Sequence, residues 1–153
     1  MKQRLIDAYM KTAETFAELS YARRLHVGAI VVKDDRIISI GYNGMPAGWD
    51  NNCEDETVEM YSGFEGAIHR VKLKSKPEVL HAETNAISKL ARSNEAGDNS
   101  TMFCTHAPCI DCAKLIYQSG INSVYYRDTY RDDSGLNFLE KSKVSVNRYE
   151  HKN

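Results

Sequence analysis

Residues 81–112, HAETNAISKLARSNEAGDNSTMFCTHAPCIDC, place a predicted helix, a strand and the start of a second helix in succession. Metal-binding residue types stand at both helix starts, in the HAE triplet at 81–83 and the PCIDC segment at 108–112. One imidazole and two thiols suit Zn²⁺, and three protein ligands leave the fourth tetrahedral position open for water, as in catalytic zinc sites. The sequence therefore predicts one catalytic Zn²⁺ per chain, held by His81, Cys109 and Cys112.

Glu83 stands two residues after His81, on the first turn of the predicted helix. At this offset the carboxylate can face the metal-bound water without ligating the metal, so Glu83 is the predicted general acid–base. A Cys-x-x-Cys pair alone also occurs in redox motifs and structural zinc sites. A structural site has no need of a carboxylate beside the water, so Glu83 favours catalysis.

Composition narrows the class of protein. The chain has 153 residues, which is enough length for one domain with a core, and we predict a single domain over 1–153. Its net charge is −1. A nearly neutral charge balance argues against a protein that holds a long nucleic-acid backbone by charge, so we expect no nucleic-acid partner. No apolar run reaches membrane-spanning length, and residues 1–5 lack a signal-peptide core. We expect no membrane partner and a cytoplasmic location, in the host cytoplasm if the source is viral.

Hydrophobic periodicity predicts the elements. Apolar residues at helical spacing predict four helices, over 4–19, 82–92, 109–119 and 132–141. Apolar and β-branched runs predict five strands, over 27–33, 36–42, 101–105, 121–126 and 144–146. Residues 53–80 have no clear pattern, and short helices on either side of Gly63 and Gly66 are one interpretation. Residues 147–153 are expected to form a disordered polar tail.

This order of elements predicts an α/β protein with a mixed sheet covered by helices on both faces. The HAE and PCxxC motifs resemble the signature of the zinc-dependent cytidine deaminase superfamily. Longer stretches are similar to deoxycytidylate (dCMP) deaminases: RxxVGA at 24–29, GYNGMPAG at 41–48, HAETNAI at 81–87, PCxxCAK at 108–114 and QSGI at 118–121. The resemblance covers about residues 20 to 131, and the short chain is similar to bacteriophage and bacterial members.

The resemblance implies a three-layer α/β/α fold with a five-stranded mixed sheet and both zinc-binding pieces at helix N-termini. The implied reaction is hydrolysis of dCMP to dUMP and ammonia, which supplies dUMP for thymidylate synthesis. Zn²⁺ would activate the water that attacks C4 of the cytosine ring. Glu83 would move its proton to N3 and then to the leaving amine.

The same resemblance implies a substrate site. Asn43 matches the residue that contacts the sugar hydroxyl, although an asparagine here could simply form a turn. Four residues would line the ring pocket, largely through backbone atoms: Ala82, Thr105, His106 and Ala107. For His106, orientation of a loop is an equal alternative. Three residues would bind the 5′-phosphate, unless they are solvated surface residues: Arg24, which matches best, and the pair Tyr130 and Arg131.

Members of the family are usually hexamers that dCTP activates and dTTP inhibits, with Mg²⁺ on the triphosphate. The resemblance therefore implies a homo-hexamer, these two effectors and Mg²⁺ as a second cofactor. The candidate allosteric residues lie in the loop after the second strand, in the acidic segment that follows, and on the helix after His81: Gly44, Ala47, Gly48, Trp49, Glu54 and Arg92.

Three alternatives stay open. The substrate could be another cytosine or purine compound, or a nucleic acid read by tyrosines such as Tyr125 and Tyr126, although no basic stripe accompanies them. The chain could instead be a catalytically silent zinc scaffold that senses nucleotides. A second, structural zinc would use Cys53 and His69, with His26 as a third candidate. Position 79 is a valine where a further histidine ligand is wanted, so we expect no second zinc.

Overall fold

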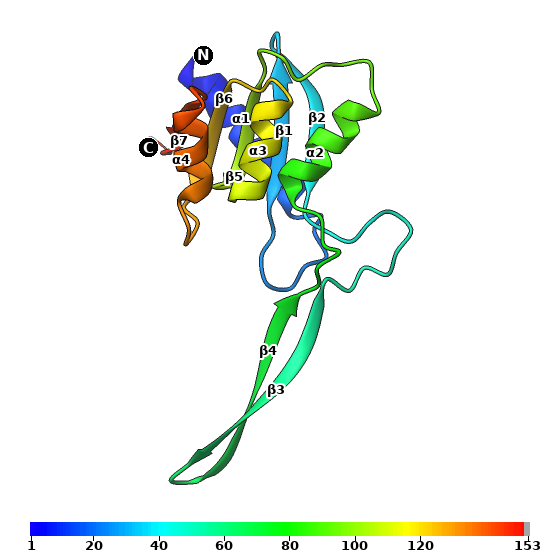
Figure 1. The fold of residues 1–153 in the computed structure, drawn as a ribbon, viewed down its shortest axis with the longest axis vertical. Coiled ribbons are helices and arrows are strands. Elements are labelled where there is room, and N and C mark those ends of the chain that lie inside the picture. The colour runs from blue at the N-terminus through cyan, green and yellow to red at the C-terminus, as the bar shows by residue number, and fades with distance from the viewer. Residues whose placement is uncertain (152–153) are drawn as a thin grey trace.

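The computed structural model describes residues 1–151, which form a layered body and a long arm (Figure 1). The sheet of the body has the strand order β2-β1-β5-β6-β7. Its strands are β1 (Gly28–Lys33), β2 (Arg36–Tyr42), β5 (Thr101–His106), β6 (Ser123–Asp128) and β7 (Ser145–Arg148). β1 is antiparallel to both β2 and β5, whereas β5, β6 and β7 run parallel, so the sheet is mixed as predicted.

Helices cover both faces of this sheet. They are α1 (Gln3–Ala17), α2 (Ala82–Ala91), α3 (Ile110–Gln118) and α4 (Ser134–Lys141). Because successive strand residues point to opposite faces, Ile30 of β1 packs in a cluster with α1, while Val31 packs in the cluster that includes α2 and α3. The three-layer α/β/α prediction is therefore confirmed. No helix within residues 1–151 is long and apolar enough to cross a bilayer.

Close packing of α2 on β2 positions the HAE triplet. A β-carbon added to Gly41 of β2 would lie 2.1 Å from the carbonyl oxygen of Ala82 and 2.6 Å from the amide nitrogen of Ala86. Only glycine leaves room for the helix backbone at this distance. The first turn of α2 is thereby held against the sheet.

The segment between β2 and α2 differs from the sequence interpretation. The interpretation of short helices on either side of Gly63 and Gly66 is wrong, because β3 (Glu54–Gly63) and β4 (Gly66–Ser75) form an antiparallel hairpin. This hairpin, which we call the arm, is a separate two-stranded sheet that projects from the body (Figure 1). Cross-strand pairing matches residues of complementary kind in this segment, since it sets Asp55 opposite Lys74 and Val58 opposite Val71.

The C-terminal segment is more ordered in structure than its polarity suggests. β7 extends to Arg148, and the backbone N–H of Tyr149 donates to the carbonyl oxygen of Tyr126 at 2.7 Å. The Tyr149 ring packs against the cluster beneath α1. The predicted disordered tail over 147–153 is therefore wrong for residues 147–149, because parallel pairing with β6 satisfies their backbone; residues 152–153 lie outside the described part.

Candidate active site

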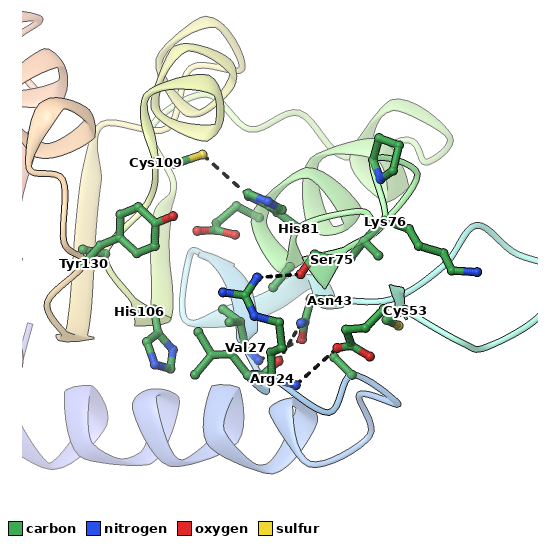
Figure 2. A pocket seen from close by; sticks show the side chains of 18 of the residues that line it. Arg24, Val27, Asn43, Cys53, Ser75, Lys76, His81, His106, Cys109 and Tyr130 are labelled. Carbon is green, nitrogen blue, oxygen red and sulfur yellow. Dashed lines mark hydrogen bonds between the residues drawn. The ribbon is translucent and has the colours of Figure 1, made fainter. Parts of the chain in front are cut away.

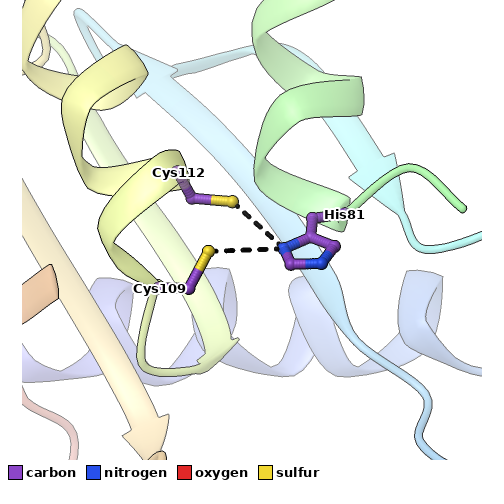
Figure 3. Close-up of side chains that lie close together, drawn as sticks. All are labelled: His81, Cys109 and Cys112. Atoms are coloured by element: carbon purple, nitrogen blue, oxygen red, sulfur yellow. Dashed lines mark hydrogen bonds between the residues drawn. The ribbon is translucent and has the colours of Figure 1, made fainter. Parts of the chain in front are cut away.

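The three predicted ligands meet where α2 and α3 begin (Figure 3). His81 is the N-cap residue of α2 and Cys109 that of α3, while Cys112 lies in the first turn of α3. His81 Nδ1 lies 3.3 Å from Cys112 Sγ and 3.6 Å from Cys109 Sγ. α3 starts at Ile110, slightly later than expected from Pro108. Both helices direct their positive ends at this cluster, which favours thiolates and other anions.

The geometry of this cluster fits a tetrahedral Zn²⁺. Zinc bonds of about 2.3 Å to sulfur and about 2.1 Å to nitrogen separate tetrahedral ligand atoms by about 3.5–3.8 Å. All three ligand atoms lie within 4.8 Å of one another. Little movement is therefore needed to bind the ion, and one position is left for a water.

The two thiols lose their first proton easily and hold the second one tightly. A hydrogen bond from Cys112, and another from His81, lower the pKa of Cys109 to about 4. The same contact with Cys109, followed by burial, raises the pKa of Cys112. A dication bound here would release the Cys112 proton, because zinc binds thiolates.

Glu83 lies beside the cluster with only 4% of its surface exposed. Burial raises the pKa of its carboxyl to about 7, since a low-dielectric environment disfavours the charged form. A nearby Zn²⁺ would pull this pKa back down by favouring the carboxylate. The side chain can therefore take up and return a proton near neutral pH, as a general acid–base must.

Glu83 and His81 line a pocket of about 560 Å³, which Figure 2 shows from close by. It contains the predicted substrate-site residues except one: Arg24, Asn43, Ala82, His106, Ala107, Tyr130 and Arg131. The exception is Thr105, which is 1% exposed and whose hydroxyl accepts the N–H of Gly28 at 3.1 Å. Ser75 and Lys76 also line the pocket. The sequence does not point to these two residues, because they reach the pocket only where β4 of the arm returns to the body.

The pocket contains cations that no carboxylate neutralises. Within the described chain, neither Arg24 nor Arg131 has a carboxylate oxygen within 4.0 Å. Arg24 Nη1 instead donates to Ser75 Oγ at 3.2 Å. Its neighbour Arg23 is paired with Glu54 and Glu56. Arg24 is thus the member of the pair that is available to an anion.

Glu54 braces the loop that carries Arg24. It is 1% exposed, and its Oε1 accepts the backbone N–H of Arg23 at 2.8 Å and of Arg24 at 3.2 Å. Asn43 holds the other side of the loop, since its amide accepts from Val27 N at 2.9 Å and donates to the Leu25 carbonyl at 2.8 Å. These contacts position the pocket wall.

Both ring nitrogens of His106 face protein groups. Nδ1 lies 3.1 Å from Thr105 Oγ1, and Nε2 lies 3.5 Å from Asp128 Oδ2. Burial lowers the pKa of His106. Asp128 is itself held by Arg127, which bonds Glu14 of α1. This chain of contacts favours the loop-orienting role for His106.

The candidate allosteric residues other than Glu54 are spread over two regions. Gly44 pairs with Leu80, donating at 3.1 Å and accepting at 2.8 Å, and Ala47, Gly48 and Trp49 follow it in an exposed loop. Arg92 caps the far end of α2, about 15 Å along the helix from its start. The structure therefore does not bring Arg92 to this loop within one chain.

The residues considered for a second zinc lie apart. Cys53 is buried at the base of the arm, whereas His69 lies within β4 opposite Met60. His26 Nε2 lies 2.6 Å from the carbonyl oxygen of Ala22. Across residues 1–151, the one group of at least three metal-ligating side chains brought together is His81, Cys109 and Cys112.

Fold and site together define the class of metal-dependent hydrolases, because the three predicted ligands and the carboxylate predicted as acid–base stand at two adjoining helix N-termini. Residues 3–128 match the cytidine and deoxycytidylate deaminase zinc-binding region, and the chain belongs to this family. The resemblance predicted from the motifs is confirmed.

Three relatives document the similarity. The crystal structure of the dCMP deaminase from cyanophage S-TIM5, in complex with dCMP and dUMP, matches with a TM-score of 0.84 and 43% identity, over 97% of this chain and 99% of that chain. The deoxycytidylate deaminase of Enterobacteria phage T4 is 37% identical over 68% of this chain and 67% of its own length. That of Saccharomyces cerevisiae is 31% identical over 94% of this chain, which spans only 44% of the yeast protein.

Proposed function

We propose that this chain catalyses the hydrolysis of dCMP to dUMP and ammonia. The observation that carries the proposal is one pocket that joins the His81–Cys109–Cys112 cluster and Glu83 to the unpaired cation of Arg24. A deaminating centre and an anion site within one cavity suit a nucleoside monophosphate. The similarity to dCMP deaminases over almost the whole chain supports the same substrate.

The residues divide the work of the reaction. His81, Cys109 and Cys112 would hold the Zn²⁺, which when bound supplies the Lewis acidity that activates water at neutral pH. Glu83 accepts one proton of this water and passes it to N3 of the ring, where it stays in the product. Glu83 then carries the second proton, from the hydroxyl now on C4, to the amino group, which leaves as ammonia while the C4 carbonyl forms. Ala82 and Ala107 form the walls that hold the ring, and His106, which also lines the pocket, orients the loop that carries Ala107. Arg24, Tyr130 and Arg131 bind the phosphate and orient the substrate.

The direct test is ammonia release from dCMP by the zinc-loaded protein, measured beside deoxycytidine, CMP and a cytosine-containing oligonucleotide. The proposal expects turnover of dCMP to exceed that of the others. Tyr125 supports a free nucleotide, since its ring stacks on Phe103 in the core, with centroids 5.0 Å apart, and does not offer a surface platform. No ammonia from dCMP, with zinc bound, would refute the proposal.

Replacing Arg24 with alanine is expected to raise KM for dCMP by about tenfold or more, because one charge-assisted hydrogen bond contributes about 1.5–3 kcal/mol. Arg24→Lys should recover part of the loss. The matched control is the substrate: kcat/KM for deoxycytidine, which lacks the phosphate, should stay within about twofold. Steady-state kinetics on both substrates measures this. An equal loss on both would assign Arg24 to the fold of the loop.

We further propose that the chain is a homo-hexamer regulated by dCTP and dTTP, with Mg²⁺ on the triphosphate. The motif at 41–48 supports this proposal, together with the exposure of Trp49 in the same loop. Gly48 has φ +84°, a backbone conformation that favours glycine, and no atom lies within 4 Å of an added β-carbon. Glu54 has a different set of contacts, which suit the bracing of Arg24 better than a direct effector contact.

Binding of dCTP with Mg²⁺ is expected to change the fluorescence of Trp49, the single tryptophan of the chain, which is 57% exposed. The emission wavelength of an indole ring shifts when a ligand replaces the water around the ring. Titration with dCTP, with and without Mg²⁺ and in the absence of dCMP, measures the change. A signal that is the same for Gly48→Ala as for the unchanged protein, or no signal at all, would count against this loop as the effector site.

A further inference from the structure

The base of the arm holds Arg24 at two points. Glu54 and Ser75 are the first cross-strand pair of the arm and lie directly opposite each other in its register. Glu54 Oε1 accepts the backbone N–H of Arg24 at 3.2 Å, and Ser75 Oγ accepts from Arg24 Nη1 at 3.2 Å. One pair of residues therefore contacts both the backbone and the guanidinium of the same arginine (Figure 2).

Arg24 lies between two cavities. Besides the pocket that contains Glu83, it lines a second cavity of about 460 Å³ on the arm. That cavity is also lined by the carboxylate of Glu59 and by two further cations, Arg70 and Lys72. An arginine side chain has several rotatable bonds, and holding it in one place costs much of its rotamer freedom. The guanidinium of Arg24 can therefore occupy either cavity unless a contact fixes it.

Ser75 supplies this contact. The hydrogen bond to Ser75 is the one that the side chain of Arg24 makes within residues 1–151. Ser75 lines the substrate pocket, whereas the residues that line the second cavity do not include it. The bond therefore holds the guanidinium at the wall of the substrate pocket.

The pairing of the arm sets the position of Ser75. Ser75 ends β4, and the next residue, Lys76, donates its backbone N–H to the Cys53 carbonyl oxygen at 2.8 Å. Glu54, opposite Ser75, is 1% exposed. Both strands are thus held against the body at this level, and the hydroxyl of Ser75 has a fixed place beside Arg24.

We propose that Ser75 is a positioning residue for the substrate phosphate, because its hydroxyl holds the Arg24 guanidinium on the pocket side, where an anion can meet it. The inference rests on the proposed hydrolysis of dCMP and adds a residue to its phosphate site. A hydroxyl suits this task, since it accepts an N–H without neutralising the charge. A carboxylate at position 75 would pair with Arg24 and compete with the phosphate.

Ser75→Ala is expected to raise KM for dCMP about three- to tenfold, the range of one hydrogen bond, while kcat changes less than twofold. The kcat/KM for deoxycytidine, which lacks the phosphate, should stay within about twofold. Ser75→Thr keeps the hydroxyl and should restore KM. Ser62→Ala is the matched control, because it makes the same change near the tip of the arm, opposite Ala67 and outside the pocket. Steady-state kinetics of the zinc-loaded protein measures these values.

A double variant decides whether Ser75 acts through Arg24. In a chain that already carries Arg24→Ala, Ser75→Ala should change KM for dCMP less than twofold, because the guanidinium that Ser75 holds is gone. A loss of equal size in both backgrounds would overturn the proposal. An unchanged KM for Ser75→Ala would overturn it too, and an equal loss on dCMP and deoxycytidine would assign Ser75 to the fold of the arm alone.

Binding of inorganic phosphate separates this inference from the proposed reaction. Isothermal titration calorimetry of the zinc-loaded, nucleotide-free protein gives the dissociation constant for phosphate in each variant. If Ser75→Ala weakens phosphate binding only where Arg24 is present, the positioning role stands even without turnover of dCMP. If dCMP is turned over but neither KM nor phosphate binding responds to Ser75→Ala, the reaction stands and the positioning role is wrong.

Discussion

Replacing Glu83 with glutamine is expected to lower kcat for dCMP by about 10³-fold while one zinc per chain stays bound. Glutamine keeps the size of the side chain but cannot take up the proton of the attacking water. A positioned general acid–base contributes about 10²- to 10⁴-fold, and Glu83, at 4% exposed, is shielded from solvent that could substitute for it. Steady-state kinetics with zinc analysis of the same sample measures both quantities.

Glu78→Gln is the matched control, because Glu78 is an exposed glutamate five residues earlier and does not line the pocket. Its kcat should equal that of the unchanged protein. If Glu83→Gln turned over dCMP near the normal rate, the assignment of Glu83 as acid–base would be wrong. If it lost both zinc and turnover, Glu83 would have a role in building the metal site.

Gly135→Ala is expected to weaken zinc binding by about 10- to 100-fold, the effect typical of losing support around metal ligands. Gly135 stands on the first turn of α4, where an added β-carbon would lie 2.1 Å from the Pro108 carbonyl oxygen and 2.8 Å from the Cys109 carbonyl carbon. These are backbone atoms, so relief requires movement of the turn that carries Cys109. Overpacking of this kind also lowers the free energy of unfolding by about 1–3 kcal/mol.

Competition with a chelator of known affinity measures the zinc dissociation constant, and thermal unfolding measures stability. Gly63→Ala is the control, since its added β-carbon would meet only the Gly66 carbonyl oxygen, at an ordinary 3.9 Å. Its zinc affinity should not change. A Gly135→Ala protein with normal zinc affinity would show that the turn can yield without displacing Cys109.

The metal site was predictable because its residues lie close together in sequence, within the first turns of two helices. His81 and Glu83 are fixed relative to each other by one helix turn, and Cys109 and Cys112 by another. Hydrophobic periodicity was equally informative for β1, whose alternate residues pack on opposite helix layers. Motif resemblance, and not periodicity, pointed to Arg24, and the structure adds that Arg23 is the arginine paired with carboxylates.

The arm was not predictable from periodicity. Its alternation of apolar and charged residues is interrupted by Tyr61 and Ile68, which lie opposite each other on the same face as Asp55 and Glu59, and its polar surface resembles that of a loop. Cross-strand partners up to 21 positions apart decide its structure. The contribution of Ser75 and Lys76 to the pocket follows from this pairing, because the N–H of Lys76 closes the base of the arm on the Cys53 carbonyl at 2.8 Å.

The sequence by itself indicated the cluster of His81, Cys109 and Cys112, the place of Glu83 beside it, and the order of helices and strands in the body, since each depends on spacing within a few residues. Only the tertiary structure decided which cation is available in the pocket, how Glu54 and Asn43 brace the loop before β1, and that a separate two-stranded arm projects from the body. Those features arise from contacts between segments far apart in the chain, where burial and pairing outweigh local preference.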